Sequence, residues 1–277
     1  MSESFYSPEY RQGTLDRVMV ALEADERLIG VIIVGSGAVG FDDDYSDIDL
    51  CIVCPDEQTL AIYQDWRQRF ERLLPVIHCC PVTYTPNSHL YALLLDGFLE
   101  LDAGFIGIGS LVAKRERWKV AFDRSGKIGE IMTRSWESRR PTDLKHEYLR
   151  RVEGIWHHIL HVGAALRRGQ LWKALHYLET IRNRTIELAG LRLGLGIDHF
   201  REIDRLPAEL LADLQETMPE QATDTEIIRA LECAIGCFFR EARKYDEILG
   251  LGYSAKLEPG MREFLALLAK GDDHAEA

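Results

Sequence analysis

Two aspartates that follow a glycine-rich turn are the residues best suited to chemistry in this chain. Asp47 and Asp49 lie in the segment VGSGAVGFDDDYSDIDL, residues 34–50, where an apolar run typical of a strand begins. With one residue between them on a strand, both carboxylates would project from the same face. A divalent cation would relieve their mutual repulsion, and hard oxygen ligands of this kind suit Mg²⁺ shared with substrate phosphates.

Gly35 and Ser36, at the end of the preceding apolar run, have the properties of a phosphate-binding turn. A glycine lets the backbone approach a phosphate closely, and a serine offers a hydroxyl and a main-chain N–H to a phosphate oxygen. This turn and the two aspartates together predict a site for a metal-bound triphosphate. We interpret the aspartates at 42–44 as a solvated acidic loop.

A two-metal centre needs a further carboxylate from a neighbouring strand. The segment LELDAGF supplies Glu100 and Asp102, which are two residues apart and therefore share a strand face. Carboxylates within such an apolar run need a reason to be there. We expect Asp102 to be the third ligand, with Glu100 as the alternative.

In the order of these residues, the chain resembles the nucleotidyltransferases of the DNA polymerase β superfamily, and within it the antibiotic nucleotidyltransferases acting on aminoglycosides and lincosamides. The family pattern is an apolar strand, Gly-Ser, a spacer and Asp-x-Asp. Here Gly35-Ser36 precedes SDIDL, and Ser36 and Asp47 are 47 − 36 = 11 positions apart, which looks like the streptomycin/spectinomycin adenylyltransferases in particular. The resemblance implies that Asp47, Asp49 and Asp102 hold magnesium, and that Gly35 and Ser36 contact the nucleotide phosphates.

The elements that position these residues are expected to form a small mixed-sheet α/β domain. Helical spacing begins at Ser7-Pro8 and recurs over residues 57–74. Short apolar runs predict strands over 31–34, 48–53, 76–84 and 98–105. We therefore predict an α+β protein with an N-terminal nucleotidyltransferase domain over 1–120 and a connection over 121–140.

From residue 141 onward, the spacing of apolar residues by three and four predicts a second, helical domain over 141–277 that binds the substrate. We expect four or five helices, over 144–166, 171–190, 207–218, 225–249 and 259–268. Lys173 and Arg182 are candidates for binding the nucleotide, because positive charge must offset a triphosphate and related enzymes use a basic residue from this region. The alternative is a helix whose polar side is simply solvated.

The composition and net charge of the chain limit the kinds of molecule that it is expected to bind. Hydrophobic residues make up 46% of the chain, which suits a globular protein with a real core. The 33 basic and 45 acidic residues give a net charge of −12, which repels nucleic acids and anionic lipids and favours a cationic small molecule. The sequence has no leader-like N-terminus and no apolar run long enough to span a membrane, so we expect a cytoplasmic protein.

The sequence thus predicts an Mg²⁺-dependent enzyme that transfers AMP from ATP to a hydroxyl of a small acceptor, such as an aminoglycoside or lincosamide. We expect the acceptor to lie between the domains. The base of the nucleotide, the acceptor and the oligomeric state are left open. Two alternatives are a non-catalytic or regulatory module of the same fold that binds nucleotide or a protein partner, and an enzyme that modifies protein or nucleic acid.

Overall fold

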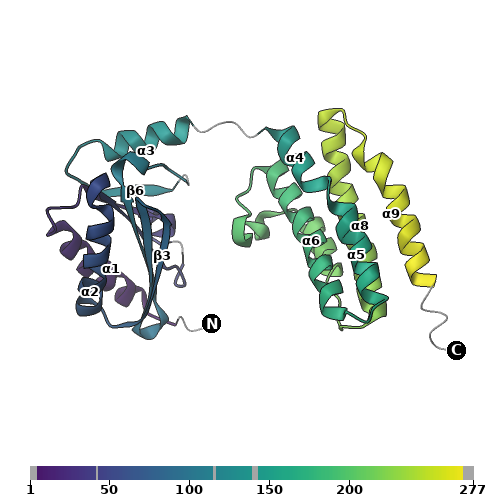
Figure 1. Cartoon of the computed structure of the whole chain (residues 1–277), viewed down its shortest axis with the longest axis horizontal. Coiled ribbons are helices and arrows are strands. Elements are labelled where there is room, and N and C mark those ends of the chain that lie inside the picture. The colour runs from purple at the N-terminus through teal and green to yellow at the C-terminus, as the bar shows by residue number, and fades with distance from the viewer. Residues whose placement is uncertain (1–4, 42, 115–116, 139–142, 271–277) are drawn as a thin grey trace. The chain divides into compact units, whose positions relative to one another are not determined.

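The apolar runs of the first 140 residues pair into a mixed β-sheet (Figure 1). In the computed structural model, which describes residues 5–41, 43–114, 117–138 and 143–270, six strands have the order β3-β4-β5-β2-β1-β6. The strands are β1 (Gly30–Val34), β2 (Ile48–Cys54), β3 (Val76–Thr85), β4 (Ser88–Leu95), β5 (Glu100–Gly107) and β6 (Trp118–Asp123). β2 and β5 run parallel, whereas the other neighbouring strands are antiparallel.

Helices pack on both faces of this sheet. On one face, α1 (Pro8–Glu23) and α2 (Thr59–Leu73) bury the apolar stripes that their spacing predicts. That hydrophobic cluster includes Leu15, Val18, Leu22, Leu50, Trp66, Phe70, Leu101 and Phe105. On the other face, α3 (Ile128–Glu137) contributes Ile128 and Met132 to a smaller cluster with Ile32 and Val53. The smaller cluster leaves part of the second face available to a ligand.

The segment 121–140, which we expected to be a connection, contains the end of β6 and all of α3. These elements belong to the first of two compact units, residues 1–140 and 141–277. β6 is short and lies at the edge of the sheet, where it pairs with β1 far upstream in the sequence. Such a short run has no strong periodicity of its own, which explains why the sequence pattern did not reveal it.

Within residues 143–270 the structure has six α-helices, one more than the largest number expected (Figure 1). They are α4 (Leu144–Val152), α5 (Ile155–Leu166), α6 (Leu171–Leu193), α7 (Ala208–Glu216), α8 (Asp224–Leu249) and α9 (Tyr253–Lys270). The helix expected over 144–166 is interrupted before Gly154, the residue that precedes α5. Glycine lowers helix stability, so one predicted helix becomes two.

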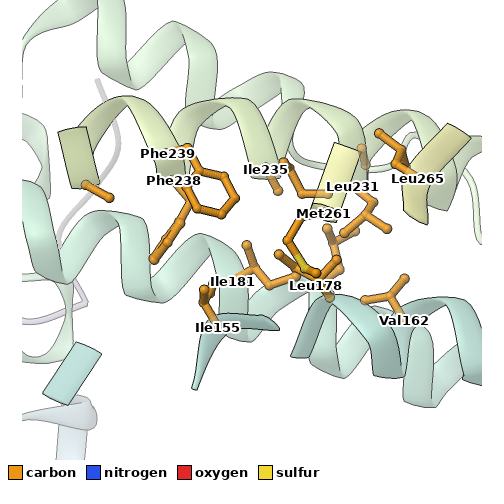
Figure 2. Packing of buried hydrophobic residues seen from close by; sticks show 14 of the residues in the cluster. Ile155, Val162, Leu178, Ile181, Leu231, Ile235, Phe238, Phe239, Met261 and Leu265 are labelled. Atoms are coloured by element: carbon orange, nitrogen blue, oxygen red, sulfur yellow. The ribbon is translucent and has the colours of Figure 1, made fainter. Parts of the chain in front are cut away.

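The apolar periodicity of these helices produces one large core. Figure 2 shows Leu178 and Ile181 from α6 packing near side chains from α5, α8 and α9. α7 packs through a smaller cluster that joins it to the second half of α6. The protein therefore has the predicted α+β class, a mixed sheet followed by a helical bundle. No helix in the described ranges is both long and apolar enough to cross a membrane.

Candidate active site

Asp49 and Asp102 lie side by side on the partly open face of the sheet. Asp49 is the second residue of β2, Asp102 is the third residue of β5, and the two are register partners in the parallel ladder. Their immediate neighbours Ile48, Leu50 and Leu101 are buried, whereas the two aspartates are only partly so. The strand alternation therefore buries one face and presents two carboxylates on the other.

The surroundings of Asp102 disfavour its negative charge. Burial raises the pKa of the Asp102 carboxyl to about 6, and the charges of Glu100, Asp49 and Asp47 add to the rise. Its Oδ1 atom is buried and finds no hydrogen-bond partner among the described residues. A buried oxygen without a donor is costly, and a cation or a proton at this position would remove that cost.

Glu100, the alternative third carboxylate, is at the exposed start of β5. It lies two residues before Asp102 on the same strand face, and its partner on the antiparallel side is Leu94. Asp102, in contrast, is level with Asp49. Depth along the strand therefore favours Asp102 as the carboxylate that acts together with Asp49.

The Gly-Ser turn reaches the same carboxylates. Residues Gly35–Val39 form a short 3₁₀ helix after β1, and Gly35 has φ +69°. A Cβ atom on residue 35 would lie 2.7 Å from Oδ2 of Asp49. Only glycine, which adopts positive φ without strain and has no side chain, lets this backbone approach Asp49 so closely.

The main-chain N–H of Gly35 is engaged within the protein, because it donates to the carbonyl oxygen of Arg117 at 3.3 Å. Gly35 thus allows the backbone to lie close to Asp49, whereas its amide is used within the protein. Ser36 accepts a hydrogen bond from the amide of Phe41 at its carbonyl oxygen, at 2.9 Å. This bond helps to close the turn that presents the Ser36 hydroxyl.

A cavity of about 270 Å³ lies beside the carboxylate pair. Its lining is mainly apolar and includes Asp49, Cys51, Gly104, Ile106, Lys114, Arg117 and Trp118. The cavity joins one of the carboxylates to two cationic residues, which suits a ligand that is both anionic and partly apolar. The sequence analysis did not select Lys114 or Arg117. The available signal was this pair of basic residues just before the start of β6.

A divalent cation fits the chemistry of this site. Asp47, Asp49 and Asp102 carry carboxylate oxygens, the kind of ligand atom that Mg²⁺ prefers, and the buried Oδ1 of Asp102 has no hydrogen-bond partner among the described residues. Asp47 lies directly before β2, close enough for its charge to act on Asp102. Among the described residues, however, no three His, Cys, Asp or Glu side chains are already arranged to hold a metal ion.

The two basic residues expected to bind the nucleotide both lie on α6, but in different surroundings. Arg182 donates from Nε to Oγ1 of Thr217 at 2.6 Å and from Nη2 to the Thr217 carbonyl oxygen at 2.8 Å. These bonds hold the end of α7, so Arg182 has a structural role within the second unit. Lys173 is exposed near the start of α6. Lys173 and Arg182 are 182 − 173 = 9 positions apart, which corresponds to about 13 Å along the helix, so the structure does not bring the two together.

A mixed sheet that presents adjacent carboxylates next to a Gly-Ser turn is the arrangement of a nucleotidyltransferase. The chain belongs to the streptomycin adenylyltransferase family, because the model of the family with that description matches residues 10–268. The family resemblance predicted from the sequence is thereby confirmed, and the protein is an enzyme of the nucleotidyltransferase type.

Solved structures of low sequence identity also match. An aminoglycoside 6-adenyltransferase from Bacillus subtilis is 13% identical over 95% of this chain and 99% of that chain, with a TM-score of 0.46. A nucleotidyltransferase-like protein from Exiguobacterium sibiricum 255-15 is 12% identical over 85% of this chain and 78% of that chain, with a TM-score of 0.39. No curated protein matches this chain.

Proposed function

We propose that this enzyme transfers AMP from ATP to a hydroxyl group of a small cationic acceptor and releases pyrophosphate, with Mg²⁺ as its cofactor. The observation that supports this most directly is the register pairing of Asp49 with Asp102, where one carboxylate oxygen is buried without a donor. Like charges that are held next to each other in a partly buried position are typical of functional sites. Transfer of a nucleotide from a metal-bound triphosphate is a reaction that uses such a cluster.

Asp47 and Asp49 would hold the metal that accompanies the triphosphate, and Asp102 would complete the ligand set. When bound, Mg²⁺ would neutralise phosphate charge and make the α-phosphorus a better electrophile. Ser36 would donate its hydroxyl to a phosphate oxygen. The neighbouring Gly35 would keep the turn close to Asp49. A Cβ atom at this position would lie only 2.7 Å from Oδ2 of Asp49, so a larger residue would not allow this approach.

Asp102 is also the group best placed to take up the acceptor's proton. In the metal-free site, burial raises the pKa of the Asp102 carboxyl, so this carboxylate is a stronger base than an ordinary aspartate. As the acceptor oxygen bonds to the α-phosphorus, its proton would move to Asp102. The bond from the α-phosphorus to the bridging oxygen breaks, and pyrophosphate leaves with that electron pair.

The acceptor class follows from charge and family. The net charge of −12 favours a polycationic molecule over an anionic one. The family description names streptomycin, which is an aminoglycoside with hydroxyl groups. We therefore propose an aminoglycoside as the acceptor. Lys173 stays a candidate for the nucleotide phosphates because it is exposed on α6, whereas Arg182 is a weaker candidate because of its bonds to Thr217.

The test is to incubate the protein with Mg²⁺, ATP or GTP and a panel of aminoglycosides and lincosamides, and to measure pyrophosphate release. Asp47→Asn and Asp49→Asn should each lower turnover by about a thousandfold or more, because charge stabilisation in the transition state is lost. Asp44→Asn, which removes a charge from the nearby acidic loop, is the matched control and should keep turnover. Nucleotide binding without release of pyrophosphate for any acceptor would favour a binding module instead.

A second comparison separates the two carboxylates of β5. Asp102→Asn should reduce turnover more than nucleotide affinity, because Asp47 and Asp49 can still hold the metal-bound nucleotide while the base is lost. Glu100→Gln should be milder. Titration of nucleotide binding beside the pyrophosphate assay measures both effects. An active Asp102→Asn next to an inactive Glu100→Gln would reverse the assignment.

A further inference from the structure

Arg11, on helix α1, is a buried cation to which the proposed mechanism gives no role. Only 4% of its surface is exposed, and burying a guanidinium is costly unless its N–H groups find acceptors. Its Nη1 donates to the main-chain oxygens of Asp43 and Ser46, both at 2.9 Å. Arg11 therefore ties α1 to the segment that leads directly into Asp47.

Aromatic side chains hold the same segment. The guanidinium carbon of Arg11 lies 4.0 Å from the centre of the Phe41 ring, within the range of a cation–π interaction. The Tyr6 hydroxyl donates to the main-chain oxygen of Ser46 at 2.8 Å. The Ser46 carbonyl thus accepts hydrogen bonds from two side chains that are far away in the sequence.

We propose that Arg11 is a positioning residue for Asp47, and that it fixes the place from which this carboxylate reaches the metal-bound nucleotide. The inference rests on the proposed function, in which Asp47 is a metal ligand. A peptide unit is planar, so the Ser46 carbonyl oxygen and the Asp47 nitrogen lie in one plane. Donors that hold this oxygen therefore hold the main chain at Asp47, and partners of this kind tune metal affinity from outside the ligand set.

The charges of this region are consistent with the arrangement. The pKa of the Tyr6 phenol is raised, mainly by burial, while the positive charge of Arg11 opposes the rise and the negative charge of Asp47 adds to it. Tyr6 therefore lies within electrostatic reach of both Arg11 and Asp47. A positive charge here also offsets part of the repulsion among the acidic residues.

The chain offers a matched control in Arg124. Its guanidinium donates to main-chain oxygens that include those of Asp25 and Leu28, and lies 4.9 Å from the centre of the Phe122 ring. It thus makes the same kinds of contact as Arg11, in the same unit, with residues outside the candidate active site. Arg124→Met and Arg11→Met should both lower the thermal midpoint, because each removes hydrogen bonds to main-chain oxygens.

Two readouts distinguish positioning from stability alone. The first is the shift of the thermal midpoint by Mg²⁺ or Mn²⁺ without nucleotide, and the second is the Mg²⁺ concentration that gives half-maximal pyrophosphate release. Arg11→Met should raise the half-saturating metal concentration by about tenfold or more, whereas Arg124→Met should leave it unchanged. Arg11→Lys, which keeps the charge but loses the fork of donors, should lie between wild type and Arg11→Met.

Tyr6→Phe provides a variant that removes one hydroxyl and preserves the fold if Arg11→Met does not. It should raise the half-saturating metal concentration in the same direction by a smaller factor. The proposal would be overturned if wild type, Tyr6→Phe and Arg11→Lys had the same half-saturating metal concentration. It would also be overturned if Arg124→Met raised this concentration as much as Arg11→Met, or if the wild type bound no metal. A wild type that binds metal but releases no pyrophosphate would refute the proposed function alone, and metal binding by the variants would still decide the role of Arg11.

Discussion

Replacing Asp102 by asparagine should stabilise the metal-free protein at neutral and alkaline pH, although it removes a functional group. The pKa of this carboxyl rises from 3.8 to about 6 on folding. At about 1.4 kcal/mol for each pKa unit, ionised Asp102 destabilises the fold by up to about 3 kcal/mol. Because the side chain is only partly buried, screening by solvent reduces this to about 1–2 kcal/mol. For a unit of this size the thermal midpoint should rise by roughly 4 °C per kcal/mol.

The sign of the pH dependence follows from the raised pKa of Asp102. Below pH 3.8 the carboxyl is protonated in both the folded and the unfolded state, and it costs no stability. As the pH rises from 3.8 through about 6, the unfolded state releases its proton first, so the wild type loses stability. Asparagine does not titrate. The advantage of Asp102→Asn should therefore be small near pH 4 and complete above pH 7.

Thermal denaturation in EDTA at pH 4.5 and pH 8 measures this difference in stability. Glu100→Gln is the control, because it removes a charge from an exposed position on the same strand, and surface changes of this kind shift stability by about 0.5 kcal/mol or less. A gain for Asp102→Asn that is equal at both pH values would refute the reasoning. Absence of any gain at pH 8 would mean that the carboxylate is already compensated without a metal.

Two further predictions concern the Gly-Ser turn and the ion pair between the buried Asp25 and the partly exposed Arg27 in the first unit. Gly35→Ala should lower turnover by about a hundredfold, because the added Cβ would displace Asp49. The control is Gly40→Ala: Gly40 also has a positive φ, but the space around it is open. A pyrophosphate assay should find Gly40→Ala active. Asp25→Asn should cost about 1–2 kcal/mol at pH 7 in urea denaturation, because hydrogen bonds from Arg27 lower the pKa of Asp25 from 3.8 to about 2. This contribution is present above pH 3.8 and is lost as the pH falls through about 2, so equal stability of wild type and Asp25→Asn at pH 7 would contradict it.

The sequence was sufficient to predict which residues on one strand share a face, but not which strands lie next to each other in the candidate site. Alternation along a strand was enough to expect that Glu100 and Asp102 share a face, and the structure agrees. The pairing of Asp49 with Asp102 was not predictable in the same way. It depends on β2 lying parallel to β5, which is a contact between distant parts of the chain.

The sequence pattern also missed elements whose identity depends on their neighbours. β4, with the sequence SHLYALLL, has an apolar run that periodicity alone does not assign to a strand or a buried helix. It becomes a strand because β3 and β5 pair with it on both sides. The roles of Arg11 and Arg182 were not predictable for a similar reason. In the sequence each is an ordinary polar residue within a helical pattern, and only the packing of the folded chain gives it hydrogen-bond partners on the main chain.

The parallel ladder between β2 and β5 has a consequence for how the enzyme gains activity during folding. β1 with β2, and β3 with β4 and β5, are antiparallel neighbours that short connections can bring together early. Asp49 and Asp102 belong to different groups and are 102 − 49 = 53 positions apart. Closing this loop has an entropic cost, so a chain with both antiparallel groups formed still lacks the carboxylate pair. Recovery of activity after dilution from denaturant would therefore report the joining of the two halves of the sheet, a step that secondary-structure content alone does not register.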